Sequence, residues 1–199
     1  MPTLRVRIVV VLLAVLVAAA VVIASACGSD LAANRTGLQE VDRVLDAVES
    51  DEAEQIEALV SVGKRPCERL GDISLPAGVA LIECREGEPT GTLVDAFWNG
   101  SCEGSLWYRA NPTDAALTAS RVVQWDLELY GVFKARPLES VPADYTVVFA
   151  HTDGANAVRG IALLMLDGKI IGTDQDCGLP PADLAALSQL GDPILIVGD

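Results

Sequence analysis

The chain has few of the residues on which metal and acid–base chemistry most often depend. Its 199 residues include one histidine, His151, so neither a paired-histidine zinc site nor a Ser-His-Asp spacing is present. P-loop and GxGxxG sequences are also missing. Aromatic residues make up 5% of the chain, so the core must be built mainly from aliphatic side chains. The sequence therefore lacks a motif-defined catalytic class, and we expect neither a cofactor nor a metal.

The charge of the chain is strongly one-sided. All 28 acidic residues lie beyond Cys27, together with 12 of the 14 basic residues, which gives that part a net charge of −16. Such a field repels nucleic acid, so nucleic acid is not expected as a partner. Runs of five or six like charges and internal repeats are both missing. The acidic residues thus indicate a solubilising surface and not a charged tail.

The N-terminus has the layout of an export signal. Arg5 and Arg7 precede an uncharged apolar stretch, residues 8–26, which ends in small residues before Cys27. A basic start, an apolar segment and small residues at its end are typical of chains that cross a membrane. We therefore expect the rest of the chain to lie outside the cytoplasm.

The residues at the end of this segment leave three outcomes open. Ser25, Ala26 and Cys27 resemble the lipobox of bacterial lipoprotein precursors, although Ala24 stands where that family usually has leucine. The resemblance implies cleavage and a diacylglyceryl group on Cys27. Ala24-Ser25-Ala26 also fits an ordinary cleavage site that frees a soluble protein. Uncut, the 19 residues 8–26 would form an anchoring helix of about 28 Å, nearly the thickness of the hydrocarbon core.

The number of cysteines favours acylation. Using Cys27 in a lipid bond leaves an even four: Cys67, Cys84, Cys102 and Cys177. Four cysteines suit two disulfides in an oxidising compartment. We expect one disulfide to close the loop between Cys67 and Cys84, and the other to join Cys102 to Cys177. The prediction is a lipid-anchored protein of the cell membrane with its domain on the extracytoplasmic side.

The sequence predicts one folded domain behind the export segment. Residues 1–26 are the signal peptide or membrane anchor, residues 27–37 a flexible tether, and residues 38–199 a single domain large enough to bury a core. Helices are predicted at 38–48, with Thr36 and Gln39 as a capping box, at 53–60, from Asn111-Pro112 toward Glu128, and from Pro180 to Leu190. Residues 64–88, rich in proline and glycine, predict a loop.

Strands are predicted at 92–98, 105–109, 129–136, 145–151, 157–166 and 169–173. Asp153-Gly154 and Asp167-Gly168 join the last three as hairpins. We expect the apolar residues 193–197 to pair with a sheet edge or to pack under the domain. This order predicts an α+β fold with helices packed on one side of a curved antiparallel sheet. It is similar to the NTF2-like cone, and a cystatin-like packing fits nearly as well. The front half also resembles uncharacterised exported lipoproteins.

The cone implies the candidate catalytic residues. Inside an NTF2-like cone, Tyr108, Trp125, Asp126 and Tyr130 would face the interior, where a buried Asp126 beside tyrosines suits proton abstraction. His151, at a strand end, is a second candidate base. The simpler interpretation makes the aromatics core residues, Asp126 a solvated side chain and His151 a surface residue.

We predict a non-enzymatic, membrane-tethered domain. The prediction rests on the anchor, on the paired cysteines and on the lack of a recognised catalytic motif. The partner of this domain would be an envelope protein or a small apolar ligand. Two alternatives stay open: a small cone-pocket enzyme of the isomerase, dehydratase or hydrolase type, and a structural envelope protein. A closed pocket lined by Asp126 or His151 would favour the enzyme, whereas an exposed apolar patch would favour partner binding.

Overall fold

The structure is a computed structural model of residues 1–199, and it describes residues 34–69, 82–101, 104–136, 141–152, 158–177 and 190–197. The chain divides into two units, Met1–Asn34 and Arg35–Asp199, and the fold described below is that of the second unit. The predicted export segment, residues 1–26, and most of the predicted tether, residues 27–37, lie outside the described residues. No helix within the described ranges is both long and apolar enough to cross a membrane.

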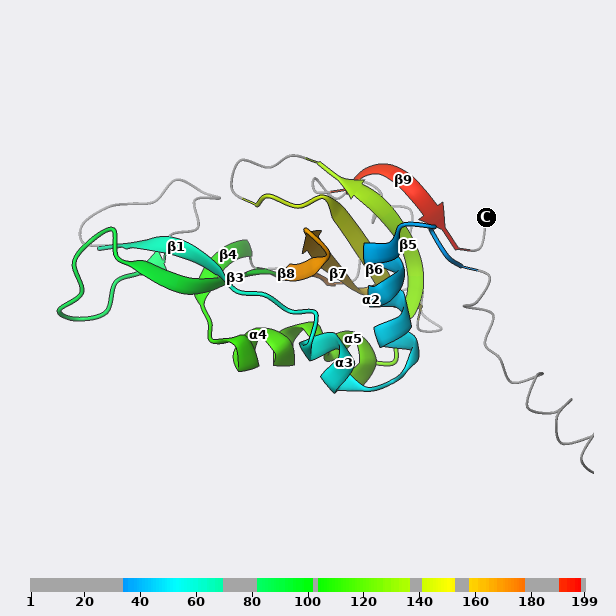
Figure 1. Ribbon diagram of the computed structural model, residues 1–199, viewed down its shortest axis with the longest axis horizontal. Coiled ribbons are helices and arrows are strands. Elements are labelled where there is room, and N and C mark those ends of the chain that lie inside the picture. Colours follow the sequence, from blue (N-terminus) through cyan, green and yellow to red (C-terminus); the bar gives the residue numbers. More distant parts are fainter. Residues whose placement is uncertain are drawn as a thin grey trace, which may run out of the picture. The chain divides into compact units, whose positions relative to one another are not determined.

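The described strands form one mixed sheet (Figure 1). Their order across the sheet is β2-β1-β3-β8-β7-β6-β5-β9, and β4 pairs with β3 off this path. The strands are β1 (Gly63–Glu68), β2 (Ile82–Glu83), β3 (Leu93–Ser101), β4 (Gly104–Arg109), β5 (Glu128–Ala135), β6 (Tyr145–Thr152), β7 (Val158–Leu166), β8 (Lys169–Cys177) and β9 (Leu190–Ile196).

The helices of the described part are short: α2 (Gln39–Glu49), α3 (Ala53–Glu57), α4 (Pro112–Ala119) and α5 (Arg121–Gln124). α4 begins as predicted, because Asn111 caps it by accepting a hydrogen bond of 2.9 Å from the backbone N–H of Asp114. The single helix predicted from Asn111 toward Glu128 is instead two, separated at Ser120.

The predicted fold class is wrong. β1 pairs with β2 in parallel, and β3 pairs with β8 in parallel, so the sheet is mixed and not antiparallel. Helices packed on one side of a curved antiparallel sheet, whether an NTF2-like or a cystatin-like cone, do not describe this arrangement. Periodicity along the chain reports whether a segment is a strand, but not which distant strand it pairs with. The β3–β8 pairing joins Asn99 to Thr173, 74 residues away.

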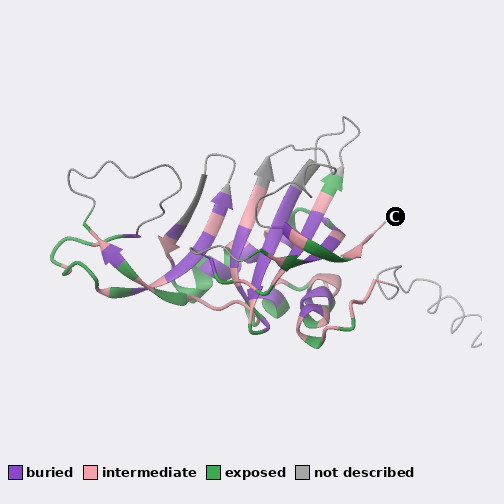
Figure 2. Ribbon diagram, turned by 90° about the horizontal axis from the view of Figure 1, so that it is seen from above, coloured by how far each residue is buried: buried purple, intermediate pink, exposed green. Residues whose placement is uncertain are grey.

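β7, predicted as the strand 157–166, is a central strand of the sheet. Residues 161–165 are all buried, so both faces of this strand are covered, since successive side chains of a strand point to opposite faces. Figure 2 shows the buried stretch along the middle of the sheet. Leu164 belongs to a cluster with Trp98 and Trp107, whereas Ala162 belongs to a second cluster with Phe133.

The C-terminal meander is also largely as predicted. Asp167 and Gly168 have φ values of 49° and 70°, the left-handed conformations that a type I′ hairpin turn requires. β6 and β7 are antiparallel neighbours, although the predicted Asp153-Gly154 turn lies outside the described residues. β9 pairs with β5, which confirms that the apolar C-terminal segment joins a sheet edge. Residues 180–189 of the helix predicted from Pro180 to Leu190 lie outside the described residues. Leu190 itself is the first residue of β9.

The start of α2 differs from the predicted capping box of Thr36 and Gln39. Leu38 is the N-cap residue and its side chain makes no capping hydrogen bond. The carboxylate of Asp42 instead accepts hydrogen bonds from the backbone N–H groups of Thr36 and Gly37, at 2.9 and 3.1 Å. Asp42, an acidic residue in the first turn, thus satisfies the two backbone N–H groups that precede the helix.

Candidate functional site

The predicted disulfide between Cys67 and Cys84 is present, with an S–S distance of 2.01 Å and a sequence separation of 17. It joins the end of β1 to the residue that follows β2, and Cys67 is fully buried. Cys102 and the side chain of Cys177 lie outside the described residues, so the second disulfide stays a prediction.

The segment after the disulfide, residues 84–92, makes two consecutive turns. The first is closed by a hydrogen bond of 3.0 Å from Glu88 N–H to the Arg85 carbonyl, and the second by one of 3.2 Å from Thr92 N–H to the Pro89 carbonyl. The backbone of Cys67 then donates to the Thr92 carbonyl and accepts from Gly91 N–H, at 2.9 and 2.8 Å. Both the disulfide and these backbone bonds therefore hold residues 84–92 against β1.

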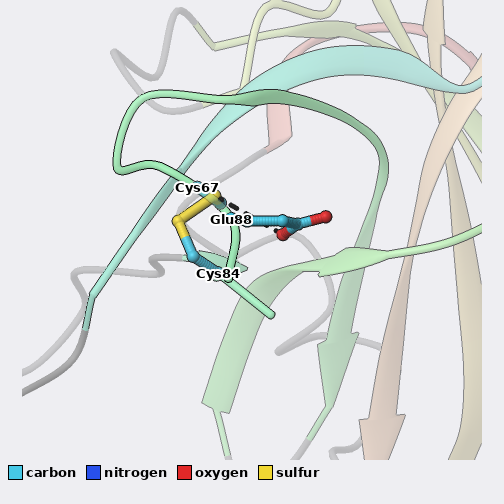
Figure 3. A group of neighbouring side chains, drawn as sticks. All are labelled: Cys67, Cys84 and Glu88. Atoms are coloured by element: carbon cyan, nitrogen blue, oxygen red, sulfur yellow. Dashed lines mark hydrogen bonds between the residues drawn. A yellow bond between two sulfur atoms is a disulfide. The ribbon is translucent and has the colours of Figure 1, made fainter. Parts of the chain in front are cut away.

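Glu88 is the best-connected side chain of this segment and lies beside the disulfide (Figure 3). Its Oε2 lies 3.9 Å from Cys67 Sγ, and this is a contact and not a hydrogen bond, because a disulfide sulfur carries no hydrogen. The carboxylate accepts two hydrogen bonds from the Arg109 guanidinium, at 2.6 and 3.0 Å, and one from Arg85 N–H at 2.8 Å. The bidentate bond from Arg109, followed by that from the Arg85 backbone, holds the pKa of Glu88 below its usual value.

Cys67, Cys84 and Glu88 also form a group of metal-type ligands in the described part of the chain. Both sulfurs are consumed in the disulfide, however, and only a free thiolate is a good cysteine ligand. The carboxylate is already occupied by Arg109. As long as the disulfide is intact, this group is a structural bridge and not a metal centre.

A groove of about 390 Å³ lies between residues 84–92 and the first turn of α4, with β1, β3 and the end of β4 completing its wall. Its charged side chains are Lys64, Arg85 and Arg109, and Glu88, Asp95 and Asp114. Most of these charges are already satisfied. Besides the Arg109–Glu88 pair, Lys64 Nζ lies 2.8 Å from Asp95 Oδ1, and Asn111 Nδ2 donates to Asp114 Oδ2 at 2.8 Å.

Arg85 is the exception among these charges. Its side chain is exposed, and its guanidinium makes no hydrogen bond or salt bridge with the residues that the structure describes. Its charge acts on Glu88 only at longer range, as a minor contribution to the lowered pKa of that carboxylate. Among the described residues, Arg85 is therefore the groove cation left to pair with a ligand.

The edge of β3 is open where it borders the groove. Because the Thr92 carbonyl accepts from Cys67 on β1, the alternation of backbone groups directs those of Leu93 and Asp95 toward the opposite edge. The hydrogen bond of 3.2 Å from Ala110 N–H to the Asp95 carbonyl agrees with this alternation.

β4 ends at Arg109, before it could pair with Leu93. Continuing the register from Ala96↔Arg109 places Pro112 opposite Leu93, and Pro112 has no N–H and begins α4. The backbone N–H and C=O of Leu93 thus face the groove without a strand partner in the described ranges. The Leu93 side chain is 63% exposed beside them.

The candidate catalytic residues from the sequence are not brought together. Asp126 is exposed in the turn after α5, with φ of 50°, and His151 is exposed near the end of β6. Tyr108 lies on β4, within 3.3 Å of the Thr118 hydroxyl, and Tyr130 lies on β5. β3, the partner of β4, is four strand spacings from β5, or about 19 Å along the sheet.

The cone interior that would have gathered these side chains is not part of the described fold. Trp125, expected inside it, is 38% exposed and has the Arg121 guanidinium 5.9 Å from its ring. Tyr130 stacks on Phe133 in the core, with ring centroids 6.3 Å apart. Proton abstraction by Asp126 beside tyrosines therefore has no geometric basis in the described residues.

Sequence reasoning located the cysteine-bracketed loop and the Asn111-Pro112 helix start, but it missed the groove between them. The pairing of Glu88 with Arg109 spans 21 residues and leaves no periodic pattern in the sequence. Pro112 is the residue in the sequence that marks the open edge, because it lies opposite Leu93 once the β3–β4 register is continued. The sequence without that register does not show the relation. The chain matches no protein-family model, no curated protein and no solved structure.

Proposed function

We propose that this protein is a non-enzymatic, membrane-tethered domain that binds a protein partner on the extracytoplasmic side of the cell membrane, through the groove beside the disulfide. The observation that carries the proposal is the open β3 edge at Leu93, which lies in a preformed groove among ion pairs. Exposed strand edges are sites at which another chain adds.

Binding suits the charges of the groove better than catalysis does. Glu88 and Asp95 are each engaged by a basic partner, and a group engaged in this way is poorly placed to exchange a proton with a substrate. Fixed ion pairs instead give a surface with a defined pattern of charge, which favours one partner over others. The wall is charged and open, so it suits a polypeptide better than the small apolar ligand considered from the sequence.

The location rests on the export segment and the cysteines. The apolar residues 8–26 and the lipobox-like Ser25-Ala26-Cys27 support export and acylation of Cys27. The Cys67–Cys84 disulfide is the kind of bond that persists in an oxidising compartment and supports the same side of the membrane.

Mass spectrometry of the membrane fraction tests the tether. We expect the N-terminal peptide to begin at Cys27 and to carry the mass of a diacylglyceryl group, because the lipobox-like residues direct both steps. The Cys27→Ser variant should keep an uncleaved N-terminus. A peptide beginning at Met1 in the wild-type membrane fraction would show that the anchor is an uncut helix and not a lipid. A soluble protein that begins at Cys27 or later would contradict the membrane tether.

Selection of displayed peptides tests the groove. We expect random dodecapeptides on phage, panned on the purified full chain in non-ionic detergent, to yield clones whose binding drops at least about tenfold with Leu93→Asp. The reason is that this change places a charge on the apolar side chain beside the open edge. Leu93 is 63% exposed, so the substitution leaves the core intact.

Leu117→Asp is the matched control for this selection. Leu117 is 53% exposed on α4 and does not line the groove, so the same substitution should leave the selected clones bound. Clones that respond equally to both substitutions, or a selection that yields no clones above background, would contradict binding at the groove and would favour the structural envelope protein.

A further inference from the structure

We propose that the segment bound in the groove is an extended peptide carrying a carboxylate, which pairs with Arg85 while the peptide backbone adds to β3 at Leu93. This inference rests on the proposed function and names the chemistry of the partner. Three features of the described residues carry it: the open strand edge, the free guanidinium, and the local balance of charge around them.

The strand edge fixes the conformation of the ligand. Leu93 offers one N–H donor and one C=O acceptor to the groove, and an extended backbone satisfies both with a single residue. α4 prevents β4 from filling this place, because Pro112 has no N–H to donate and turns the chain into the helix. The exposed Leu93 side chain adds an apolar contact for the residue that pairs with it.

Arg85 fixes the charge of the ligand. The guanidinium of Arg109 is committed to Glu88 by two hydrogen bonds, and the Lys64 ammonium is 2.8 Å from Asp95. Arg85 lines the same groove and lacks a side-chain partner in the described part of the chain. A carboxylate is the group that a guanidinium binds most specifically, through two parallel N–H···O bonds.

The local charge permits an acidic ligand here, although the chain as a whole repels one. The part beyond Cys27 carries a net charge of −16. The disulfide arm, defined as residues 63–69, 82–95 and 109–114, holds five basic and six acidic residues, a net charge of −1. Nearly all of the repulsive charge therefore lies elsewhere, and at physiological salt exposed charges more than about 8 Å away are largely screened.

The same charges argue against two other occupants. A second copy of this chain would bring another net charge of −16 toward the first, which opposes self-association. A free inorganic anion would pair with Arg85 but would leave the backbone groups of Leu93 unused. A groove of about 390 Å³ has room for a short stretch of peptide.

A peptide ladder tests this inference on the full chain in non-ionic detergent. The probes are acetylated, amidated heptapeptides of alternating valine and threonine, in which each position in turn carries Glu, Gln or Lys. We expect Glu to bind about tenfold tighter than Lys at one or two positions, and Arg85→Glu to reverse this preference at those positions. Free-acid versions without any Glu distinguish a C-terminal carboxylate from a side-chain carboxylate as the source of the charge.

Arg43→Glu is the control, because Arg43 is also exposed but lies on α2, outside the groove. It changes the net charge equally and should leave the order of Glu, Gln and Lys peptides unchanged. Equal binding of all three peptides, or a preference that Arg85→Glu does not alter, would overturn the inference. If phage selection still yields clones that depend on Leu93 but carry no acidic residue, the inference of an acidic ligand is contradicted and the proposed function is still supported.

Discussion

Replacing Cys67 and Cys84 together by serine is expected to lower the free energy of unfolding by about 3 kcal/mol, as the chain-entropy model gives for a loop of this length. The two cysteines are 17 residues apart, and the loop between them is free to expand in the unfolded chain once the bridge is gone. Urea unfolding of the full chain in non-ionic detergent, followed by tryptophan fluorescence, measures the change.

The same double variant should lose the groove before the rest of the sheet. Residues 84–92 are tied to β1 by the disulfide, by the two backbone bonds of Cys67 and by a bond of 3.0 Å from Cys84 N–H to the Glu68 carbonyl, and these backbone bonds alone remain after the substitution. Amide hydrogen exchange is therefore expected to rise in residues 84–92 while β7, buried on both faces, stays protected.

Chemical reduction of a Cys102→Ser, Cys177→Ser variant is the control for the serine side chains, since it breaks the Cys67–Cys84 bond without introducing hydroxyl groups at the buried site of Cys67 and without opening the predicted second disulfide. Both treatments should shift the urea midpoint in the same direction. A loss of stability below about 1 kcal/mol, with unchanged exchange in residues 84–92, would mean that the bridge does not hold this segment in place.

Gly172→Ala is expected to destabilise the protein by about 1–3 kcal/mol, the usual cost of overpacking a core. A Cβ at Gly172 would lie 2.6 Å from Trp98 Cβ and 3.2 Å from the Trp98 carbonyl oxygen. Trp98 is 4% exposed and packs edge-on against Trp107, with ring centroids 5.5 Å apart, so it has little room to move. The cost is a direct consequence of the parallel β3–β8 pairing, which sets Trp98 beside Gly172.

Gly63→Ala is the matched control, since Gly63 pairs with Ala96 on the same strand β3. A Cβ at Gly63 would meet only the Ala96 carbonyl oxygen, at 4.0 Å, so this change should stay within about 0.5 kcal/mol of the wild type. Thermal unfolding of the two variants, measured side by side, gives the comparison. Equal stability of both would contradict the close approach of Trp98 to Gly172 that the parallel pairing sets.

Most of the elements that were predicted correctly depend on contacts between near neighbours in the chain. Asn111 caps α4 through a residue three positions away, and Asp167-Gly168 reverses the chain between adjacent strands. The Cys67–Cys84 disulfide closes a short loop and was also anticipated. For such features the sequence window contains both partners of the interaction.

The elements that were missed depend on partners far away. β1 was predicted as part of a loop because residues 64–88 are rich in proline and glycine, and it forms a strand because β3 and β2 lie on either side of it. β3 and β8 pair in parallel across 74 residues, and this pairing turned the expected antiparallel cone into a mixed sheet.

The groove belongs to this second group. Glu88 and Arg109 are ordinary charged residues in the sequence, and they become a bidentate pair only when residues 84–92 fold against the end of β4. Leu93 reads as one more apolar strand residue until the register sets it opposite Pro112.

The core strands of the meander, the start of α4 and the first disulfide follow from the sequence, because short-range hydrogen bonding, turn geometry and apolar periodicity act within a few residues. The parallel pairings, the open edge at Leu93 and the ion pairs of the groove emerge in the folded chain alone. These features depend on which distant segments pack against one another. Hydrophobic burial drives that packing, but it is not directional, so the local pattern does not show which strand becomes the neighbour.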